Sequence, residues 1–524
     1  MGQGKEGKFS KFAEREYFGF ACPPEAQQKM IAPNKRSEGQ TQSRRWFWRA
    51  SAASFLILCF AGHLSAWLGL YGSVGMVCLI CFCVIWPMRI AGSRFDIANV
   101  LLLFVAYYFL MFGLYGFMNS FGLSHFLGVS YDPTSGSLAS LSTLASVYAG
   151  GALIAVYAGY IWMPPFLTRR QNQGPREHQS SLDLGNLRRL RVSAMVALAL
   201  SYAGCALLIF FLGGLSAIGL DPTYVATTGT HGLYWAQALI WTNHWAVLIN
   251  LLSYILLRKT HYLILTALSI PLFFIEFLLS GSKSALLFPL FGFLIVRHYC
   301  YQRITWKPLV ALSVAVLVVF AAGYAYRSTG AQGPQFEQGV VSYYQNPAVL
   351  LETVVGRFYG TDSFAIVLDS VRNGQPLLMG KSLSNLLTWY IPRWLWPGKP
   401  LSFSLTFGED FMAGAPGAGD VYYSPSLPGE LYLNFGVAGL LLGGVATGWF
   451  LRFLYRKLIE QRPRRIGAIV LYAVIAPLAA SLSGGPISVV LEFIMTRVIL
   501  FVLLYWIAGM LAGPAEYAKV AYSR

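Results

Sequence analysis

The stretch ISVVLEFIMTRVILFVLLYWIAGM, residues 487–510, decides the class of fold to which this chain belongs. It is apolar throughout except for Glu492 and Arg497 and a few small polar side chains. A helix that crosses a bilayer needs about 20 predominantly apolar residues, so the stretch predicts a transmembrane helix. Charged side chains are costly inside a membrane, so Glu492 and Arg497 are candidates either for a buried ion pair with another helix or for a function.

Stretches of the same kind recur along the whole chain. The segment at 284–299 is short, so it either crosses the membrane or re-enters it from one side. The sequence therefore predicts an all-α, polytopic integral membrane protein with about 12 transmembrane helices. The predicted spans are 47–69, 72–90, 97–118, 141–163, 192–213, 233–257, 262–280, 284–299, 308–325, 431–453, 466–482 and 487–510.

The composition supports the membrane class. Hydrophobic residues make up 56% of the chain and charged residues only 12%, whereas a soluble domain carries about 25% charged residues. The net charge of +17 would suit a nucleic-acid-binding protein. Such a protein needs a broad basic surface, and this chain has little polar surface on which to build one. We therefore expect no nucleic-acid partner.

The basic residues alternate with the predicted spans. Lys and Arg are concentrated in the N-terminal tail, in the 164–191 loop and in the 454–465 turn. The 119–140 and 214–232 loops contain neither. Short basic loops face the cytoplasm, so both termini are expected there. The excess positive charge then reflects orientation in the membrane and not a polyanion site.

The spans divide the chain into five parts. Residues 1–46 are expected to form a disordered cytoplasmic tail, part of which has the aromatic content to rest on the bilayer. Transmembrane helices 1–9 occupy 47–325, helices 10–12 occupy 431–512, and 513–524 form a second cytoplasmic tail. Residues 326–430 form one long outward loop, and a loop of this length is typical of a functional segment.

The long loop is predicted to be helical in part. Asn346-Pro347 is a good start for a helix, and apolar residues recur at helical spacing beyond it, with a break near Gly360. A second short helix is expected over 383–390, and the Gly-rich run at 413–420 has the composition of a mobile lid. Amphipathic helices against the outer leaflet would suit a substrate that lies at the membrane surface.

Several Lys and Arg residues lie in segments predicted to face outward, although Lys and Arg are normally concentrated in cytoplasmic loops. Each has two interpretations, an ordinary ion pair or a contribution to an anion site, for which the Arg side chain is well suited. For Lys283 the first interpretation is a pair with Glu276 or contact with lipid headgroups. The cations in question are Lys283, Arg327, Arg357, Arg393 and Lys399.

Carboxylates on the same side are candidates for proton transfer. Glu430 stands at the mouth of a predicted span, where burial would bring its pKa toward that of a useful general base. The adjacent Glu409 and Asp410 lack the DxD-type spacing of a metal site, and the cysteines at 78, 81 and 83 have no His or carboxylate nearby in sequence. We therefore predict no metal.

Three strings resemble the motifs of one family of membrane enzymes. They are GSKSALL at 281–287, IPRWLWPGKP at 391–400 and PSLPGELYLNFG at 425–436. They resemble the bacterial oligosaccharide repeat-unit polymerases, the O-antigen-polymerase-like (Wzy-type) family. The resemblance covers mainly residues 275–455, and the family turn commonly has Arg where this chain has Lys283.

The resemblance implies a GT-C-like glycosyltransferase at the outer face of the bacterial inner membrane. Such an enzyme transfers the growing chain from undecaprenyl pyrophosphate to a sugar hydroxyl of the incoming repeat unit. It needs no cofactor. Its partners are the lipid-linked donor and acceptor and the membrane lipid, and a chain-length regulator and a flippase are the companion proteins of such a system.

This mechanism assigns roles to the residues singled out above. The base is Glu430 or Asp362, and Arg393 and Lys399 are carried over from the family string. The residues assigned to pyrophosphate are Lys283, Arg327, Arg357, Arg393 and Lys399. Those assigned to sugar stacking are Trp389, Trp394, Trp396, Tyr422 and Tyr423.

Two alternatives stay open at this point. A set of about twelve spans also suits a flippase or another transporter of lipid-linked oligosaccharides, although the two halves of the chain show no self-similarity. A polysaccharide ligase, which moves finished polymer to a different acceptor, would use the same chemistry.

Overall fold

The computed structural model describes residues 96–114, 136–163, 182–183, 186–214, 234–280, 284–301, 358–388, 403–411, 423–461 and 464–511, together with a few single positions between them. The chain divides into two units, Met1–Leu56 and Ile57–Arg524. All described residues belong to the second unit. The predictions for the two tails, for the spans at 47–69, 72–90 and 308–325 and for the lid at 413–420 lie outside the described residues.

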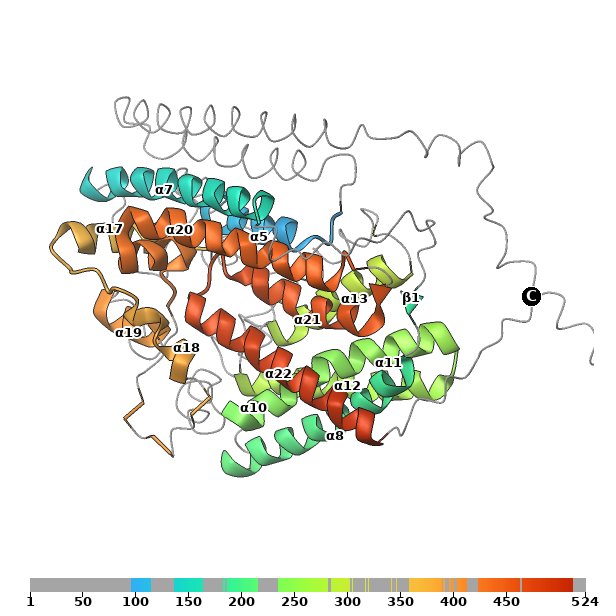
Figure 1. Cartoon of the computed structure of the whole chain (residues 1–524). Coiled ribbons are helices and arrows are strands. Elements are labelled where there is room, and N and C mark those ends of the chain that lie inside the picture. Colours follow the sequence, from blue (N-terminus) through green and yellow to red (C-terminus); the bar gives the residue numbers. More distant parts are fainter. Residues whose placement is uncertain are drawn as a thin grey trace, which may run out of the picture. The chain divides into compact units, whose positions relative to one another are not determined.

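The described residues are helical apart from one short strand pair (Figure 1). In the pair, β1 (Leu182–Asp183) runs parallel to β2 (Arg464–Arg465). The all-α class is thereby confirmed. The helices are α5 (Val100–Tyr108), η1 (Phe109–Leu114), α7 (Gly136–Ile161), α8 (Leu187–Phe211), α10 (Tyr234–Trp241), α11 (Asn243–Leu257), α12 (Thr260–Ser280), α13 (Ser284–Cys300), α17 (Gly360–Arg372), η5 (Lys381–Leu383), α18 (Asn385–Thr388), α19 (Phe403–Phe411), α20 (Ser426–Leu458), α21 (Ile466–Ser481) and α22 (Ile487–Leu511).

Each predicted span that falls within the described residues coincides with a helix or a pair of helices. Six stretches are long and apolar enough to cross a membrane, namely Leu141–Ile161, Leu187–Phe211, Tyr234–Leu257, Thr260–Leu278, Ser426–Leu458 and Ile487–Leu511. Shorter apolar helices lie at Val100–Leu114, Ser284–Cys300 and Ile466–Ser481. The chain is thus a helical membrane protein, and the total of twelve spans stays a prediction.

The long helices differ in how much of their surface the protein itself covers. Within the apolar windows, 72% of the residues are buried in the α10–α11 stretch, against 33% in α12 and 39% in α8 and α22. The uncovered positions carry large apolar side chains, such as Phe210 at 74% exposure and Trp506 at 62%. Such surfaces belong in lipid, so α11 is central and α8, α12 and α22 are peripheral.

Glycines bring α7 and α20 into close contact along their length (Figure 1). A Cβ atom added at Gly448 would overlap the backbone oxygen of Val156, and one at Gly159 would overlap that of Val445. Small residues allow such close approach between helices in a membrane, where van der Waals packing replaces the hydrophobic effect. The pair fixes α20, and α20 in turn carries one of the predicted site residues.

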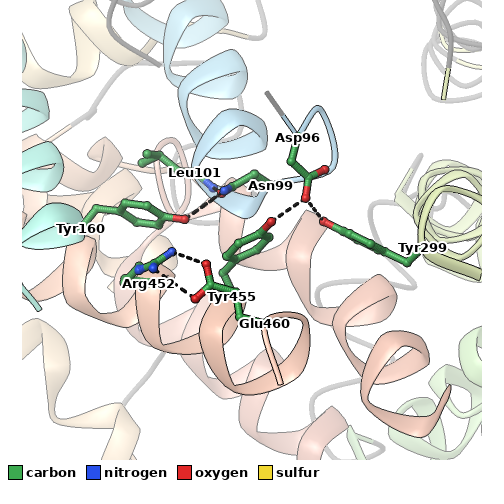
Figure 2. Close-up of polar contacts among 8 residues, drawn as sticks. All are labelled: Asp96, Asn99, Leu101, Tyr160, Tyr299, Arg452, Tyr455 and Glu460. Carbon is green, nitrogen blue, oxygen red and sulfur yellow. Dashed lines mark hydrogen bonds and ion pairs between the residues drawn. The ribbon is translucent and has the colours of Figure 1, made fainter. Parts of the chain in front are cut away.

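One carboxylate gathers several helix ends (Figure 2). Asp96 Oδ2 accepts hydrogen bonds from Tyr299 at 2.7 Å and Tyr455 at 2.5 Å. Its Oδ1 lies 2.9 Å from His298 Nε2. Because His298 Nδ1 accepts the backbone N–H of Ile304, Nε2 is the nitrogen that donates to Asp96. We call Asp96, His298, Tyr299 and Tyr455 the Asp96 cluster.

The polar groups around the Asp96 cluster are also paired. Asn99 and Tyr160 hydrogen-bond each other at 3.0 Å, and Tyr472 donates to the carbonyl oxygen of Ala98 at 2.7 Å. Arg452 binds Glu460 through two hydrogen bonds. These groups join one end each of α5, α7, α13, α20 and α21. The basic loops predict that all five ends lie on the cytoplasmic side of the membrane.

Burial alone would raise the pKa of Asp96. The hydrogen bonds donated by His298, Tyr455 and Tyr299 outweigh the burial, so the pKa lies below its ordinary value. The ionised carboxylate is therefore part of the folded structure.

Candidate functional site

Helix α20 is broken near its start, and the described part of the long loop binds at the break. Gly436 has φ 61° and ψ −148°, a conformation that disfavours residues with a Cβ atom. The break frees the carbonyl groups of Leu433 and Asn434. These groups accept hydrogen bonds from the backbone N–H groups of Leu378 at 2.9 Å and Met379 at 3.1 Å. The loop is thus attached to the helix through its backbone.

Glu430 lies in the short segment of α20 before this break. The side chain is 0% exposed. One carboxylate oxygen accepts from the Ser382 hydroxyl at 2.7 Å, and the other accepts from the backbone N–H of Ile487 at 2.6 Å. Asn434 donates to the Ser382 hydroxyl oxygen and, through its own side-chain oxygen, accepts the N–H of Gly380.

The Glu430 network has a structural consequence. Ile487 is the first residue of α22, so the carboxylate of Glu430 caps the N-terminus of that helix, where negative charge is favourable. The network therefore joins α20, the loop and α22. The structure places Glu430 at this junction, with both of its oxygens already hydrogen-bonded, and its proposed role as a base stays a prediction.

Asp362, the second carboxylate predicted as a base, lies in the first turn of α17. It is 9% exposed, and every residue from Gly360 to Leu368 is buried. Helix α17 packs on α7, α20 and η1, and the Cα atom of Phe364 is near Gly429, next to Glu430. The sequence predicted a helix lying on the outer leaflet. Instead, this part of the loop is covered by protein because its apolar residues are buried against neighbouring helices.

Lys399 is the one predicted pyrophosphate residue within the described part of the chain. Its ammonium group donates to the carbonyl oxygen of Ile391 at 3.2 Å, and its charge interacts with Glu492 of α22. The other four, Lys283, Arg327, Arg357 and Arg393, lie outside the described residues.

The predicted sugar-stacking residues fall into two groups. Trp396 is 39% exposed, as a stacking surface requires. Tyr423 is 2% exposed, and its ring packs edge-on against Tyr359, so its ring is enclosed by protein. The remaining three, Trp389, Trp394 and Tyr422, lie outside the described residues.

A row of polar side chains continues from Glu430 along α22. Glu492 hydrogen-bonds the side chain of Tyr234 on α10. The Tyr234 hydroxyl also lies 2.7 Å from the Thr496 hydroxyl, and Thr496 donates to the carbonyl oxygen of Glu492 at 2.9 Å. We call Glu492, Thr496 and Arg497 of α22, with their partners on α10 and α12, the α22 polar row.

Arg497 is the most deeply placed member of the α22 polar row. It is 4% exposed, and its guanidinium carbon lies 4.7 Å from the centre of the Trp241 ring. Its charge interacts favourably with that of Glu276 on α12, which is 6% exposed. The two charges interact favourably across the two helices, and the expected ion pair of Arg497 stays a prediction. However, the Nε and Nη1 atoms of Arg497 have no hydrogen-bond partner among the described residues.

Several partners in these networks have no signal in the sequence. Ser382 is an ordinary polar residue of a loop, and Tyr234 and Trp241 are ordinary aromatic residues near the end of a span. Their roles depend on contacts between segments far apart in the chain. Among the described residues, no three His, Cys, Asp or Glu side chains are grouped so as to hold a metal ion.

No family model, no curated protein and no solved structure matches this chain. The function is therefore argued from the residues themselves.

Proposed function

We propose that this protein is a polysaccharide polymerase of the bacterial inner membrane. It joins oligosaccharide repeat units carried on undecaprenyl pyrophosphate, at the outer face of the membrane. The anomeric carbon of the growing chain passes from the lipid pyrophosphate to a hydroxyl group of the incoming unit. Cations hold the pyrophosphate leaving group, and a carboxylate takes the proton of the hydroxyl.

The observation that carries the proposal is the convergence of two motif strings at one end of α22. Lys399, from the string at 391–400, interacts with Glu492 of that helix. Glu430, from the string at 425–436, binds the first residue of the same helix. A loop cation and carboxylates beside apolar, lipid-facing helices are what transfer from a lipid-linked pyrophosphate requires.

The direct test is a reaction of the purified full-length protein, in lipid vesicles, with one defined lipid-linked repeat unit. We expect a ladder of products that differ by one repeat unit. Alanine variants of Lys283, Arg357 and Arg393 are each expected to shorten the ladder at normal protein level. Undiminished long polymer from all three variants would contradict their assignment to pyrophosphate.

A transporter is the second candidate, because a specific observation favours it. Arg497 and Glu276 are charges buried between helices, and transporters commonly bind their substrates among such residues near the midplane of the membrane. The location of the lipid-linked intermediates in a deletion strain separates the classes. Loss of a polymerase leaves single units on the outer face, whereas loss of a flippase traps them inside. Loss of a ligase leaves long chains on the carrier lipid.

The proposed orientation places both termini in the cytoplasm. A reporter enzyme that is active only in the periplasm should therefore be inactive when fused after residue 524 and active when inserted in the long loop. Activity of the C-terminal fusion would contradict the proposed topology.

A further inference from the structure

Glu492 differs from the other carboxylates at the loop-bound end of α22. Glu430 is fully buried, and both of its oxygens are held by fixed donors. Asp362 is 9% exposed in a turn that the protein covers. Glu409 and Asp410 are exposed on α19. Glu492 is half-buried and interacts with Lys399, a cation of the long loop.

We infer that Glu492 accepts the proton of the attacking sugar hydroxyl. This inference rests on the transferase function proposed above and concerns the same site. A general base must be reachable by the substrate and must be held in a fixed orientation. Partial exposure provides the first condition, and the surroundings of Glu492 provide the second.

Two neighbours orient the Glu492 carboxylate. The Tyr234 side chain hydrogen-bonds to it from α10, and Tyr234 is itself held by Thr496, one helical turn further along α22. The positive charge of Lys399, in the long loop, interacts favourably with the carboxylate. The residue lies five positions after Ile487, so at a rise of about 1.5 Å per residue it is about 7.5 Å below the start of α22. Glu492 is thus much nearer to the end of α22 at which the long loop binds than to the other end of the helix.

The reaction balances with these groups. The O–H bond of the acceptor sugar breaks, and its proton goes to Glu492. The oxygen forms a new bond to the anomeric carbon of the donor. The bond from that carbon to the pyrophosphate oxygen breaks, and its electron pair leaves with the lipid pyrophosphate. The proton on Glu492 then passes to water.

Glu492→Gln tests the inference in the vesicle assay, because Gln keeps the size and the hydrogen bond but cannot accept the proton. General acid–base catalysis contributes about 10²–10⁴ in rate, so we expect the first transfer to slow by at least about 100-fold. Binding of the lipid-linked donor should stay within about twofold of the wild-type value. Glu409→Gln, a change of the same chemistry on an exposed residue of α19, is the matched control and should keep the wild-type rate.

The outcomes separate the two proposals. Wild-type protein that yields no ladder from its own lipid-linked unit overturns the polymerase function. A wild-type ladder that persists in Glu492→Gln within about threefold of the normal rate overturns only the role of Glu492.

Lys399→Met is a second variant in case Glu492→Gln does not fold. Among the described residues, the titratable groups that interact with Glu492 are Tyr234 from α10 and Lys399 from the loop. Loss of the cation disfavours the ionised carboxylate, so the acid limb of the rate–pH profile should move to higher pH. An unchanged profile would contradict the assignment.

Discussion

The Asp96 cluster and the α22 polar row are both sets of polar side chains between helices, but they differ in how completely they are paired. In the Asp96 cluster each carboxylate oxygen accepts at least two hydrogen bonds, and the His298 imidazole uses both of its nitrogens. In the α22 polar row, two nitrogens of the buried Arg497 guanidinium have no partner among the described residues. A fully paired network stabilises one structure, whereas an unpaired buried donor costs free energy without stabilising the fold. The difference supports a structural role for the Asp96 cluster and is consistent with the function that we propose for the α22 polar row.

Removal of Asp96 should have the largest effect on stability. Asp96→Ala leaves the donors of His298, Tyr299 and Tyr455 without an acceptor. Each buried unsatisfied group costs about 1–3 kcal/mol, so we expect a loss of about 4 kcal/mol in the free energy of unfolding. Thermal unfolding of the purified protein in detergent measures the loss. The activity per folded molecule should not change, and a fully stable but inactive variant would refute the structural role.

Replacing the buried charges of the α22 polar row should raise the stability of the protein, whereas removal of Asp96 lowers it. Replacing a buried ion pair by apolar or neutral residues is often neutral or stabilising by about 1–4 kcal/mol. We therefore expect the double variant Glu276→Gln/Arg497→Met to be about 2 kcal/mol more stable than the wild type. It should form product more slowly, because Arg497 lies in the same row as the proposed base Glu492. The same unfolding and ladder assays measure both properties. A marked loss of stability together with normal activity would show that the row only supports the fold.

Ser382→Ala tests the junction between the loop and the two helices. The change removes one hydrogen bond to Glu430 and one of two acceptors of the Asn434 amide group, so a loss of about 1.5 kcal/mol is expected from buried hydrogen bonds of this kind. Ser384→Ala is the matched control, because its exposed hydroxyl donates to the backbone carbonyl oxygen of Lys381, three residues earlier in the same loop. A loss of equal size in both variants would argue against a specific role for the Glu430 network.

The negative charge of Asp96 should make the free energy of unfolding depend on pH in the acid range. Since the pKa of Asp96 is lower in the folded chain than in the unfolded one, its stabilising contribution is complete above the unfolded pKa of about 3.9. It is lost as the pH falls through the folded pKa. The stability difference between wild type and Asp96→Asn should therefore narrow in acid. Denaturant unfolding at a series of pH values measures it, and a difference that widens in acid would contradict the pairing.

Glu460→Gln should have the smallest effect. The ion pair of Arg452 and Glu460 is partly exposed, with side-chain exposures of 26% and 37%. Exposed pairs contribute at most about 1 kcal/mol, so the unfolding temperature should hardly change. A loss of stability as large as that of Asp96→Ala would show that the Arg452–Glu460 pair belongs to the same stabilising network as the Asp96 cluster.

The comparison also indicates which features could be predicted from sequence. The α22 helix was predicted because its apolar length alone requires a span, and Glu492 and Arg497 were noticed because charge is rare there. The same argument placed the other helices within a few residues of their observed bounds. It missed the break at Phe435 and Gly436 within α20. A break of this kind cannot be predicted from hydrophobicity, because the apolar stretch continues through it.

The partners of the charged residues could not be predicted, because they come from distant parts of the chain. Glu430 and Ser382 are 48 positions apart, and Asp96 and Tyr455 are 359 apart. Nothing in the local pattern around either carboxylate indicates which hydroxyl group will approach it. A prediction of a base at Glu430 therefore rested on its place beside a span, while its actual hydrogen bonds place it at the N-terminus of α22.

The sequence by itself determined the membrane class, the helices and the expected orientation, since these follow from apolar length and from the distribution of Lys and Arg. Only the tertiary structure decided which polar side chains meet. The small residues of α7 and α20, the break at Gly436 and the attachment of the loop set those contacts. They separate a carboxylate that caps a helix, Glu430, from one that stands beside a loop cation, Glu492. The physical reason is that burial and hydrogen bonding depend on neighbours in space, whereas the length of an apolar stretch is a property of the chain alone.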